Sequence, residues 1–249
     1  MGVFIVTGAS KGLGAAVTDE LLAQGHRVVV AARSKEPLEA FKAAHPGRVV
    51  YVVGDMTDDA TPTKLVSLAV AFGGLDGVVI NHGCLDAQTI EGSTMQGWKK
   101  VFDTNVFSCV AMAKAAMAEL RKSHGCIVWI SSGAASKPYM AWGPYGSSKA
   151  ALNAISNHVA VEEADVTSIT ISPGRIDTDM QAELRASGKD IMDEAQYQSF
   201  VDAFEQGTLL APKEPGGVIA RFVARPDKSL SGRNLTWNSP ELAAYKTSD

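Results

Sequence analysis

Short apolar runs rich in β-branched residues alternate along the chain with longer amphipathic stretches. Nearly continuous apolar runs are typical of parallel strands that are covered on both faces of a sheet. The strands predicted in this way span residues 3–6, 27–30, 49–53, 77–80, 127–130, 166–171 and 234–237. Helical patterns separate them, at residues 13–24, 35–44, 62–72, 98–122, 146–163 and 214–224.

This alternation predicts the α/β class, because parallel strands joined by helices form a doubly wound sheet with right-handed crossovers. We expect one Rossmann-type domain over residues 1–249, with about seven mostly parallel strands and helices on both faces. Residues 178–210 interrupt the rhythm with a polar sequence rich in Gln, Glu and Ala. They predict one or two short helices that cover a substrate site.

Composition narrows the possible functions. No apolar run approaches the roughly 20 residues of a membrane span. The net charge is −4 and the basic residues form no stripe, which disfavours nucleic-acid binding. The three cysteines are widely spaced and the five histidines are scattered, so neither a disulfide framework nor a metal site is expected. A cytoplasmic location fits this cysteine usage.

A glycine-rich loop follows the first predicted strand and opens the first predicted helix, with the sequence TGASKGLG. Glycines allow a tight turn, and the helix N-terminus offers N–H groups and positive dipole to a pyrophosphate. The pattern predicts a dinucleotide site, with a plain structural turn as the alternative. The candidate residues are Gly8, Ser10, Lys11, Gly12, Leu13 and Gly14.

The end of the second predicted strand indicates which dinucleotide is bound. NAD-selective folds place an acidic residue there for the ribose 2′-OH, whereas this chain has Arg33 and Ser34. With Lys11 nearby, these residues favour NADP(H), because cations bind the 2′-phosphate. The alternative for Arg33 is a solvated strand end. Asp55 and Met56 are candidates for the adenine, although Asp55 would serve equally well as a turn cap.

A second constellation combines Ser132, Tyr145 and Lys149. Tyr145 and Lys149 are four residues apart on a predicted helix and share one face. Reduction of a carbonyl needs a proton donor, and a neighbouring ammonium favours the phenolate that remains after proton transfer. Ser132 follows a buried strand and can bind the substrate oxygen. The alternative is an exposed helical pair without catalytic function.

Together these motifs resemble the short-chain dehydrogenase/reductase family over nearly the whole chain. The family's Asn-Ala-Gly element appears as Asn81-His82-Gly83, with His where the family has Ala. The resemblance implies that Tyr145 is the general acid, that Lys149 also binds the nicotinamide ribose, and that Asn105 holds a water. It also implies cofactor contacts by Asn81, Gly83, Pro173, Gly174, Ile176 and Thr178.

The run from Ile130 to Tyr139, followed by Trp142, resembles the sepiapterin-reductase-like subgroup, which includes benzil reductases. That resemblance implies NADPH-dependent reduction of a ketone or vicinal diketone. The expected substrate contacts are Ser132, Trp142, Tyr145 and Met180, although core packing would also explain Trp142 and Met180.

Other functions and the assembly state remain open. One alternative function is an alcohol dehydrogenase that works oxidatively, and another is a non-catalytic NADP-binding sensor or scaffold on the same fold. The resemblance further implies a homodimer or homotetramer built on the helices at residues 98–122 and 146–163.

Overall fold

Seven parallel strands form one sheet in the computed structural model, which describes residues 1–246. Their order across the sheet is β3-β2-β1-β4-β5-β6-β7. The strands are β1 (Val3–Thr7), β2 (Arg27–Ala32), β3 (Val49–Val53), β4 (Gly77–Ile80), β5 (Cys126–Ile130), β6 (Thr167–Ser172) and β7 (Asn234–Thr236). The predicted doubly wound α/β sheet of about seven strands is therefore confirmed.

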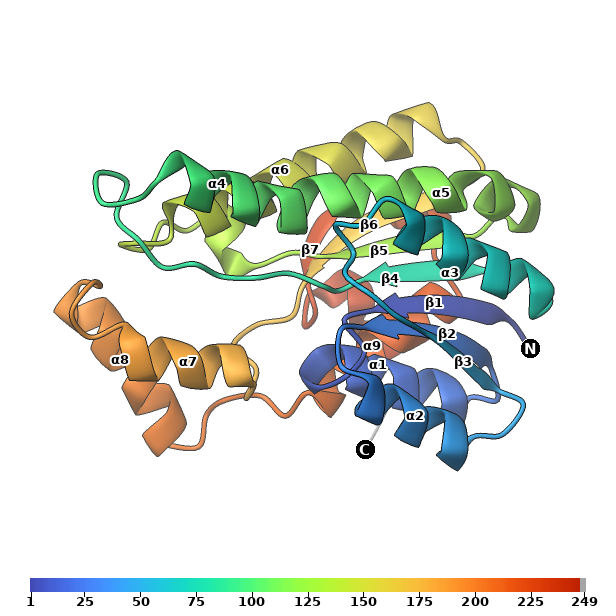
Figure 1. Ribbon diagram of the computed structural model, residues 1–249, viewed down its shortest axis with the longest axis horizontal. Coiled ribbons are helices and arrows are strands. Elements are labelled where there is room, and N and C mark those ends of the chain that lie inside the picture. The colour runs from blue at the N-terminus through green and yellow to red at the C-terminus, as the bar shows by residue number, and fades with distance from the viewer. Residues whose placement is uncertain (247–249) are drawn as a thin grey trace.

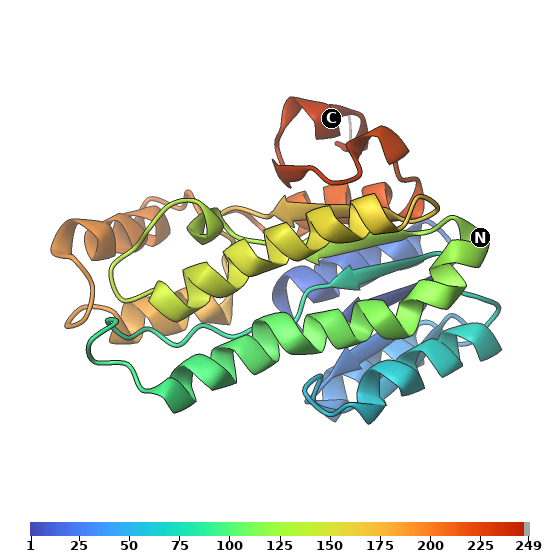
Figure 2. The same ribbon diagram turned by 90° about the horizontal axis from the view of Figure 1, so that it is seen from above.

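Helices cover both faces of the sheet (Figures 1 and 2). They are α1 (Gly12–Ala23), α2 (Lys35–Ala44), α3 (Ala60–Ala71), α4 (Met95–Phe102), α5 (Ser108–Ser123), α6 (Gly143–Glu162), α7 (Asp179–Ser187), α8 (Glu194–Glu205) and α9 (Lys213–Ala224). Helices α1, α2 and α9 pack on one face, and α3, α5 and α6 pack on the other. No helix within residues 1–246 is both long and apolar enough to cross a membrane.

Alternating side chains of each strand build the two cores. In β1, Phe4 and Val6 point toward α1 and α9, whereas Val3 and Ile5 point toward α3 and α5. All four side chains are buried, which explains why the strand sequences are apolar throughout. The order of the strands reverses beside β1, because β2 lies on one side and β4 on the other. Ligands of such sheets bind in the crevice at this reversal, outside the carboxyl ends of the strands.

The long helix predicted at residues 98–122 is not continuous. It begins three residues earlier as α4 and passes through a wider π-helical turn, Asp103–Phe107, before it continues as α5. The apolar spacing did not reveal this turn because the helix axis carries on through it. Residues 178–210 contain the two short helices α7 and α8, which project beside the carboxyl edge of the sheet.

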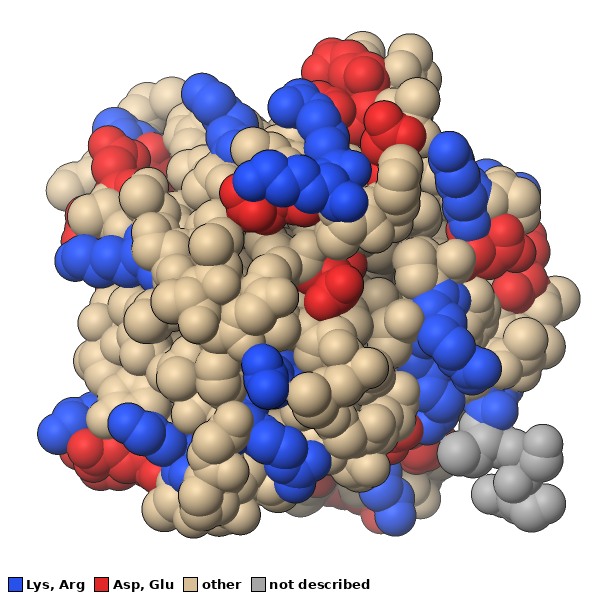
Figure 3. All heavy atoms as spheres, turned by 90° about the vertical axis from the view of Figure 1, so that its right-hand side faces the viewer, with Lys and Arg blue, Asp and Glu red and all other residues tan. Residues whose placement is uncertain are grey.

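On the surface, acidic and basic side chains are interspersed across the face shown in Figure 3. Ion pairs join Arg121 to Glu163 and Lys122 to Glu119.

Close packing of α9 against α1 holds the first helix in place. A Cβ atom added at Gly216 would lie 2.9 Å from the Cβ of Ala16 and 3.3 Å from the backbone nitrogen of Val17. The two helices approach closely only because residue 216 has no side chain. Since α1 carries the glycine-rich loop at its N-terminus, this contact also positions the loop.

We expect Gly216→Val to lower the free energy of unfolding by about 1–3 kcal/mol, because the added side chain overpacks the contact between the two helices. Urea denaturation would measure the loss. The matched control is Gly133→Val, where nothing lies within 4 Å of an added Cβ. Equal losses for the two variants would contradict the proposed role of the helix contact.

Candidate active site

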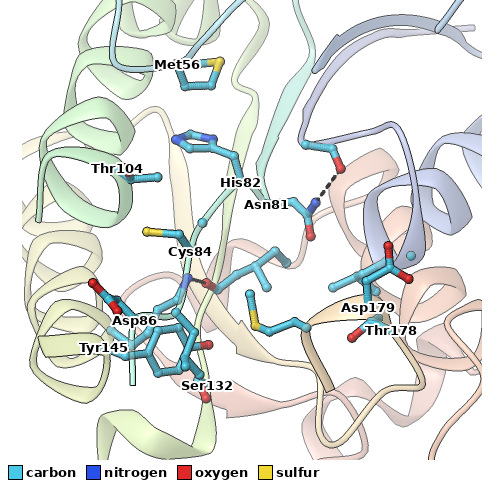
Figure 4. Close-up of a pocket in the computed structure, with 18 of the residues that line it drawn as sticks. Met56, Asn81, His82, Cys84, Asp86, Thr104, Ser132, Tyr145, Thr178 and Asp179 are labelled. Atoms are coloured by element: carbon cyan, nitrogen blue, oxygen red, sulfur yellow. Dashed lines mark hydrogen bonds between the residues drawn. The ribbon is translucent and has the colours of Figure 1, made fainter. Parts of the chain in front are cut away.

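A cavity of about 1100 Å³ opens at the carboxyl ends of the strands, where the strand order reverses (Figure 4). It brings together most of the residues that the sequence singled out. Those that line it are Gly8, Ser10, Lys11, Gly12, Leu13, Arg33, Asp55, Met56, Asn81, Gly83, Ser132, Trp142, Tyr145, Lys149, Pro173, Gly174, Ile176, Thr178 and Met180. Three candidates, Gly14, Ser34 and Asn105, do not line the cavity.

The glycine-rich loop is held in shape from behind. Gly8 and Gly12 have positive φ angles of 65° and 56°, which favour glycine. The carboxamide of Asn81 donates to the carbonyl oxygens of Thr7 and Gly8, both at 3.1 Å. A Cβ at Gly14 would lie 2.3 Å from the Gly8 oxygen, so Gly14 packs behind the loop instead of facing the cavity. The loop thus forms a cradle with the α1 N-terminus at its base.

The cations expected at the cofactor end differ in their surroundings. Arg33 lies at the mouth of the cavity and is exposed. Lys11 forms an ion pair with Asp179, the first residue of α7. Ser34 is the exposed residue that precedes α2, and it does not line the cavity. Of the three residues, only Arg33 and Lys11 therefore stand beside the cavity.

Asp55 makes the hydrogen bonds of a turn cap, which was the alternative to adenine binding. One of its carboxylate oxygens accepts from the backbone nitrogen of Thr57 at 2.9 Å and from the Thr57 hydroxyl at 2.8 Å. These hydrogen bonds lower the pKa of the Asp55 carboxyl below its usual value. The carboxylate still borders the cavity next to Met56, so a contact with an adenine remains a prediction.

Three side chains form the chemical centre of the cavity. Tyr145 and Lys149 come from α6 and are 7% and 4% exposed. The Lys149 ammonium donates to the carbonyl oxygen of Ile130 at 2.8 Å and lies 5.9 Å from the centre of the Tyr145 ring. Ser132 follows β5, and its oxygen accepts from the backbone of Ala134 at 3.1 Å, which leaves its own proton free to donate.

Asn105 ties this centre to the neighbouring backbone. Its carboxamide accepts from the Cys84 nitrogen at 2.8 Å and donates to the Cys84 oxygen at 2.8 Å. It also donates to the Ser148 hydroxyl at 3.0 Å, which donates to the Tyr145 carbonyl oxygen at 2.7 Å. The π-helical turn carries Asn105 to this buried position. The water that Asn105 was expected to hold remains a prediction.

His82 lies between β1 and α5 and also lines the cavity. Its Nδ1 lies 2.8 Å from the Thr7 hydroxyl, and its Nε2 lies 2.8 Å from the Ser108 hydroxyl. The Ser108 hydroxyl donates to the Thr104 carbonyl at 2.6 Å, so it accepts from Nε2–H. In a neutral ring with its proton on Nε2, Nδ1 accepts from the Thr7 hydroxyl, a contact shorter than the 3.4 Å one from the same hydroxyl to the Val79 carbonyl oxygen. Burial lowers the pKa of His82 to about 3.

The substrate end is walled by aromatic rings. Trp142 packs edge-on against Tyr145 at 5.6 Å between ring centres, and it lies 5.5 Å from Phe200 on α8 and 4.8 Å from Tyr139. Trp142 thus lines the cavity and also packs in a small core, which combines its two predicted roles. Met180 lines the same wall.

Cys84 borders the cavity but is a poor nucleophile. Burial raises the pKa of its thiol, which disfavours the reactive thiolate. All three cysteines are free thiols in the structure.

The sequence did not single out several other lining residues. They follow β4 and β6 or lie near the π-helical turn, and they include Asp86, Gln88, Thr104, Gln181 and Leu184. Their position after strand ends was the only available signal, because no motif marks them. Asp86 lies in the same part of the close-up as Tyr145 and Ser132, and Thr178 and Asp179 lie on the opposite side (Figure 4).

Comparisons with known proteins find relatives that cover nearly the whole chain. The family described as short chain dehydrogenase matches residues 2–189. An uncharacterized oxidoreductase of Saccharomyces cerevisiae, YIR035C, is 38% identical over 250 residues, which covers 98% of each chain. The crystal structure of YIR035C superposes with a TM-score of 0.97 at 36% identity and covers 99% of this chain and 100% of that one. The (S)-benzoin-forming benzil reductase IRC24 of the same yeast is 34% identical over 256 residues, which is 96% of this chain and 97% of the relative.

The half-buried ring of His82 makes stability depend on pH. The unfolded chain binds a proton near pH 6.5, whereas folded His82 binds one only near its pKa of about 3. Stability is therefore lost as pH falls between these values, by about 2 kcal/mol from pH 7 to pH 5 for this residue. Urea denaturation of the wild type and of His82→Ala at both pH values would measure it.

We expect His82→Ala to be less stable at pH 7, because the hydrogen bonds to Thr7 and Ser108 are lost. The difference in free energy of unfolding between the wild type and His82→Ala should be smaller by about 2 kcal/mol at pH 5 than at pH 7, since all other titrating groups are shared. Two stability curves that stay parallel from pH 7 to pH 5 would show that His82 is not held neutral by the fold.

Proposed function

This chain belongs to the short-chain dehydrogenase family, and on that basis we propose that it is an NADPH-dependent carbonyl reductase. Its substrate would be a ketone or a vicinal diketone. The family membership makes the chain an oxidoreductase. The observation that supports the finer proposal is the convergence of Ser132, Tyr145 and Lys149 beside the glycine-rich cradle, in one cavity.

The cradle suits a dinucleotide. The Gly8 carbonyl oxygen leaves no room for a side chain at residue 14. The positive φ angles of Gly8 and Gly12 let the backbone turn toward the cavity. The N-terminus of α1 then presents N–H groups to a pyrophosphate. Arg33 and Lys11 would bind a 2′-phosphate, which supports NADP(H) over NAD(H). When bound, the nicotinamide supplies the hydride.

Tyr145 would donate the proton. Its phenol transfers a proton to the carbonyl oxygen of the substrate, and the nearby Lys149 ammonium stabilises the phenolate that remains. The Ile130 carbonyl holds the ammonium in place and uses one of its three N–H donors, which leaves two for the phenol and a ribose. The free proton of Ser132 would bind the substrate oxygen while it becomes an alkoxide.

The substrate class rests on the aromatic wall and on a relative. Trp142 offers an apolar surface next to Tyr145, and Met180 adds a flexible one. The benzil reductase IRC24 supports a diaryl diketone as a first test substrate. The segment from α7 to α8 would cover this end, because Phe200 of α8 packs on Trp142. The complete Ser, Tyr, Lys and Asn set favours an enzyme over a sensor, and oxidation of an alcohol would use the same residues in reverse.

We further infer that the protein forms a homodimer or homotetramer. Helices α5 and α6 lie side by side in Figures 1 and 2. Exposed apolar side chains include Val161 of α6, 85% exposed, and Phe107 of the π-helical turn before α5, 59% exposed. Exposed apolar patches often mark contacts with another chain. A cytoplasmic location also remains a proposal, supported by the free cysteines.

We expect Tyr145→Phe to lower kcat for benzil reduction with NADPH by at least about a hundredfold, because the proton donor is removed. Steady-state absorbance at the NADPH band would measure it. Tyr139→Phe is the matched control, because it removes a hydroxyl from the same aromatic cluster without touching the catalytic centre. Near-normal turnover by Tyr145→Phe on a substrate that the wild type reduces would refute the proposed role.

We expect Arg33→Ala to raise KM for NADPH by about tenfold or more while KM for NADH stays nearly constant, because a charge-assisted bond to the 2′-phosphate is lost. Lys35→Ala is the control: Lys35 is a nearby cation that pairs with Glu39 and does not line the cavity. Equal efficiency of the wild type with both cofactors, unchanged in Arg33→Ala, would contradict the preference for NADPH.

A further inference from the structure

An ion pair crosses the cofactor end of the cavity. It joins Lys11, which precedes α1, to Asp179, the first residue of α7. Both residues line the cavity. We propose that Asp179 tunes the cofactor preference by competing with the 2′-phosphate of NADP(H) for the Lys11 ammonium. This inference rests on the proposed function, because it assumes that the 2′-phosphate is bound beside Lys11.

The fold brings the two segments together although 168 residues separate them. The N-termini of α1 and α7 meet there, because a Cβ at Gly12 would lie 3.2 Å from the Thr178 methyl group. The side chains of Lys11 and Asp179 are 68% and 64% exposed. Both can therefore rearrange when a ligand enters, without disturbing a core.

The two cations at the cofactor end of the cavity, Arg33 and Lys11, differ in whether they form an ion pair. Among the described residues, Arg33 forms no ion pair, although its charge acts on the neighbouring Asp55 carboxylate. Lys11 already has a carboxylate partner. A 2′-phosphate that binds Lys11 must draw the ammonium away from Asp179 and must approach the carboxylate itself. Both effects weaken the binding of the 2′-phosphate, and neither affects a ribose that carries only a hydroxyl group.

The position of Asp179 at the start of a helix offers a simpler explanation. A carboxylate at a helix N-terminus is favoured by the helix dipole, whatever Lys11 does. The two explanations differ in their consequences. Stabilisation of α7 would influence NAD and NADP equally through Thr178 and the neighbouring wall. Competition for Lys11 affects only nucleotides with a 2′-phosphate, and it requires Lys11.

The expected effect is modest and depends on salt. An exposed ion pair changes an equilibrium constant by a factor of about 1.4 to 5. We therefore expect Asp179→Asn to lower the Kd of NADP⁺ by about threefold at low ionic strength. The gain should fade near 1 M salt, where charges are screened within about 3 Å.

Isothermal titration calorimetry would test the proposal with four ligands: NADP⁺, NAD⁺, 2′,5′-ADP and 5′-AMP. The two short ligands lack the nicotinamide and so report on the adenine end alone. The proteins are the wild type, Asp179→Asn, Lys11→Met and the double variant. The matched control is Asp177→Asn, which removes the same charge two residues away, from a side chain that forms no ion pair among residues 1–246.

The proposal predicts a specific pattern. Asp179→Asn binds NADP⁺ and 2′,5′-ADP about threefold more tightly than the wild type, with unchanged Kd values for NAD⁺ and 5′-AMP. Lys11→Met weakens only the two ligands that carry the 2′-phosphate. In the Lys11→Met background, Asp179→Asn gives a clearly smaller gain. Asp177→Asn changes the Kd of NADP⁺ by less than Asp179→Asn does.

Several results would overturn it. Equal gains for NADP⁺ and NAD⁺ would assign the effect to α7, and a full gain in the Lys11→Met background would show that Lys11 is not involved. Weaker NADP⁺ binding by Asp179→Asn would mean that the carboxylate orients Lys11 for the phosphate. If the wild type prefers NADP⁺ and Asp179→Asn changes nothing, the inference alone fails. If the wild type has no such preference, the proposed cofactor fails together with the inference.

Discussion

The buried ammonium of Lys149 is the group around which the site is built. A charge that is 4% exposed is costly unless it is hydrogen-bonded, and the carbonyl oxygen at the end of β5 meets that need at 2.8 Å. The same bond fixes the ammonium next to the Tyr145 ring. Because the acceptor is a backbone atom of the central sheet, the position of the charge is as rigid as the sheet itself. The chemistry proposed for Tyr145 depends on this one contact.

A chain of hydrogen bonds extends that rigidity from the cofactor cradle to the catalytic helix. The Thr7 hydroxyl holds the end of β4 and the ring of His82, and His82 reaches α5 through Ser108. Asn105, in the π-helical turn that precedes α5, is hydrogen-bonded to the backbone of Cys84 and to the Ser148 hydroxyl. The His that replaces the family's Ala therefore adds a link between β1 and the start of α5. The larger residue is accommodated because its ring lies between Thr7 of β1 and Ser108 of α5.

The two ends of the cavity differ in what keeps them in place. The cradle and the catalytic centre are fixed by buried hydrogen bonds, whereas the cofactor mouth is bordered by exposed charges, Arg33 and the pair of Lys11 with Asp179. The substrate end is formed by aromatic contacts between Trp142 and Phe200 of α8. Exposed charges and a pair of short helices at the edge of the domain can be altered without loss of the fold. Cofactor and substrate preference are therefore the properties most open to change by substitution.

The sequence by itself determined the sheet, the glycine-rich loop and the Ser132, Tyr145 and Lys149 set, because each depends on local spacing: apolar runs, glycines after a strand, and two residues four apart on a helix. It did not reveal the π-helical turn, whose apolar pattern is that of an unbroken helix. Nor did it reveal the links of Lys11 to Asp179, of His82 to Ser108, or of Trp142 to Phe200. Only the tertiary structure decided these contacts, because each joins segments whose approach is set by the packing of helices on the sheet and leaves no periodic signal in the chain.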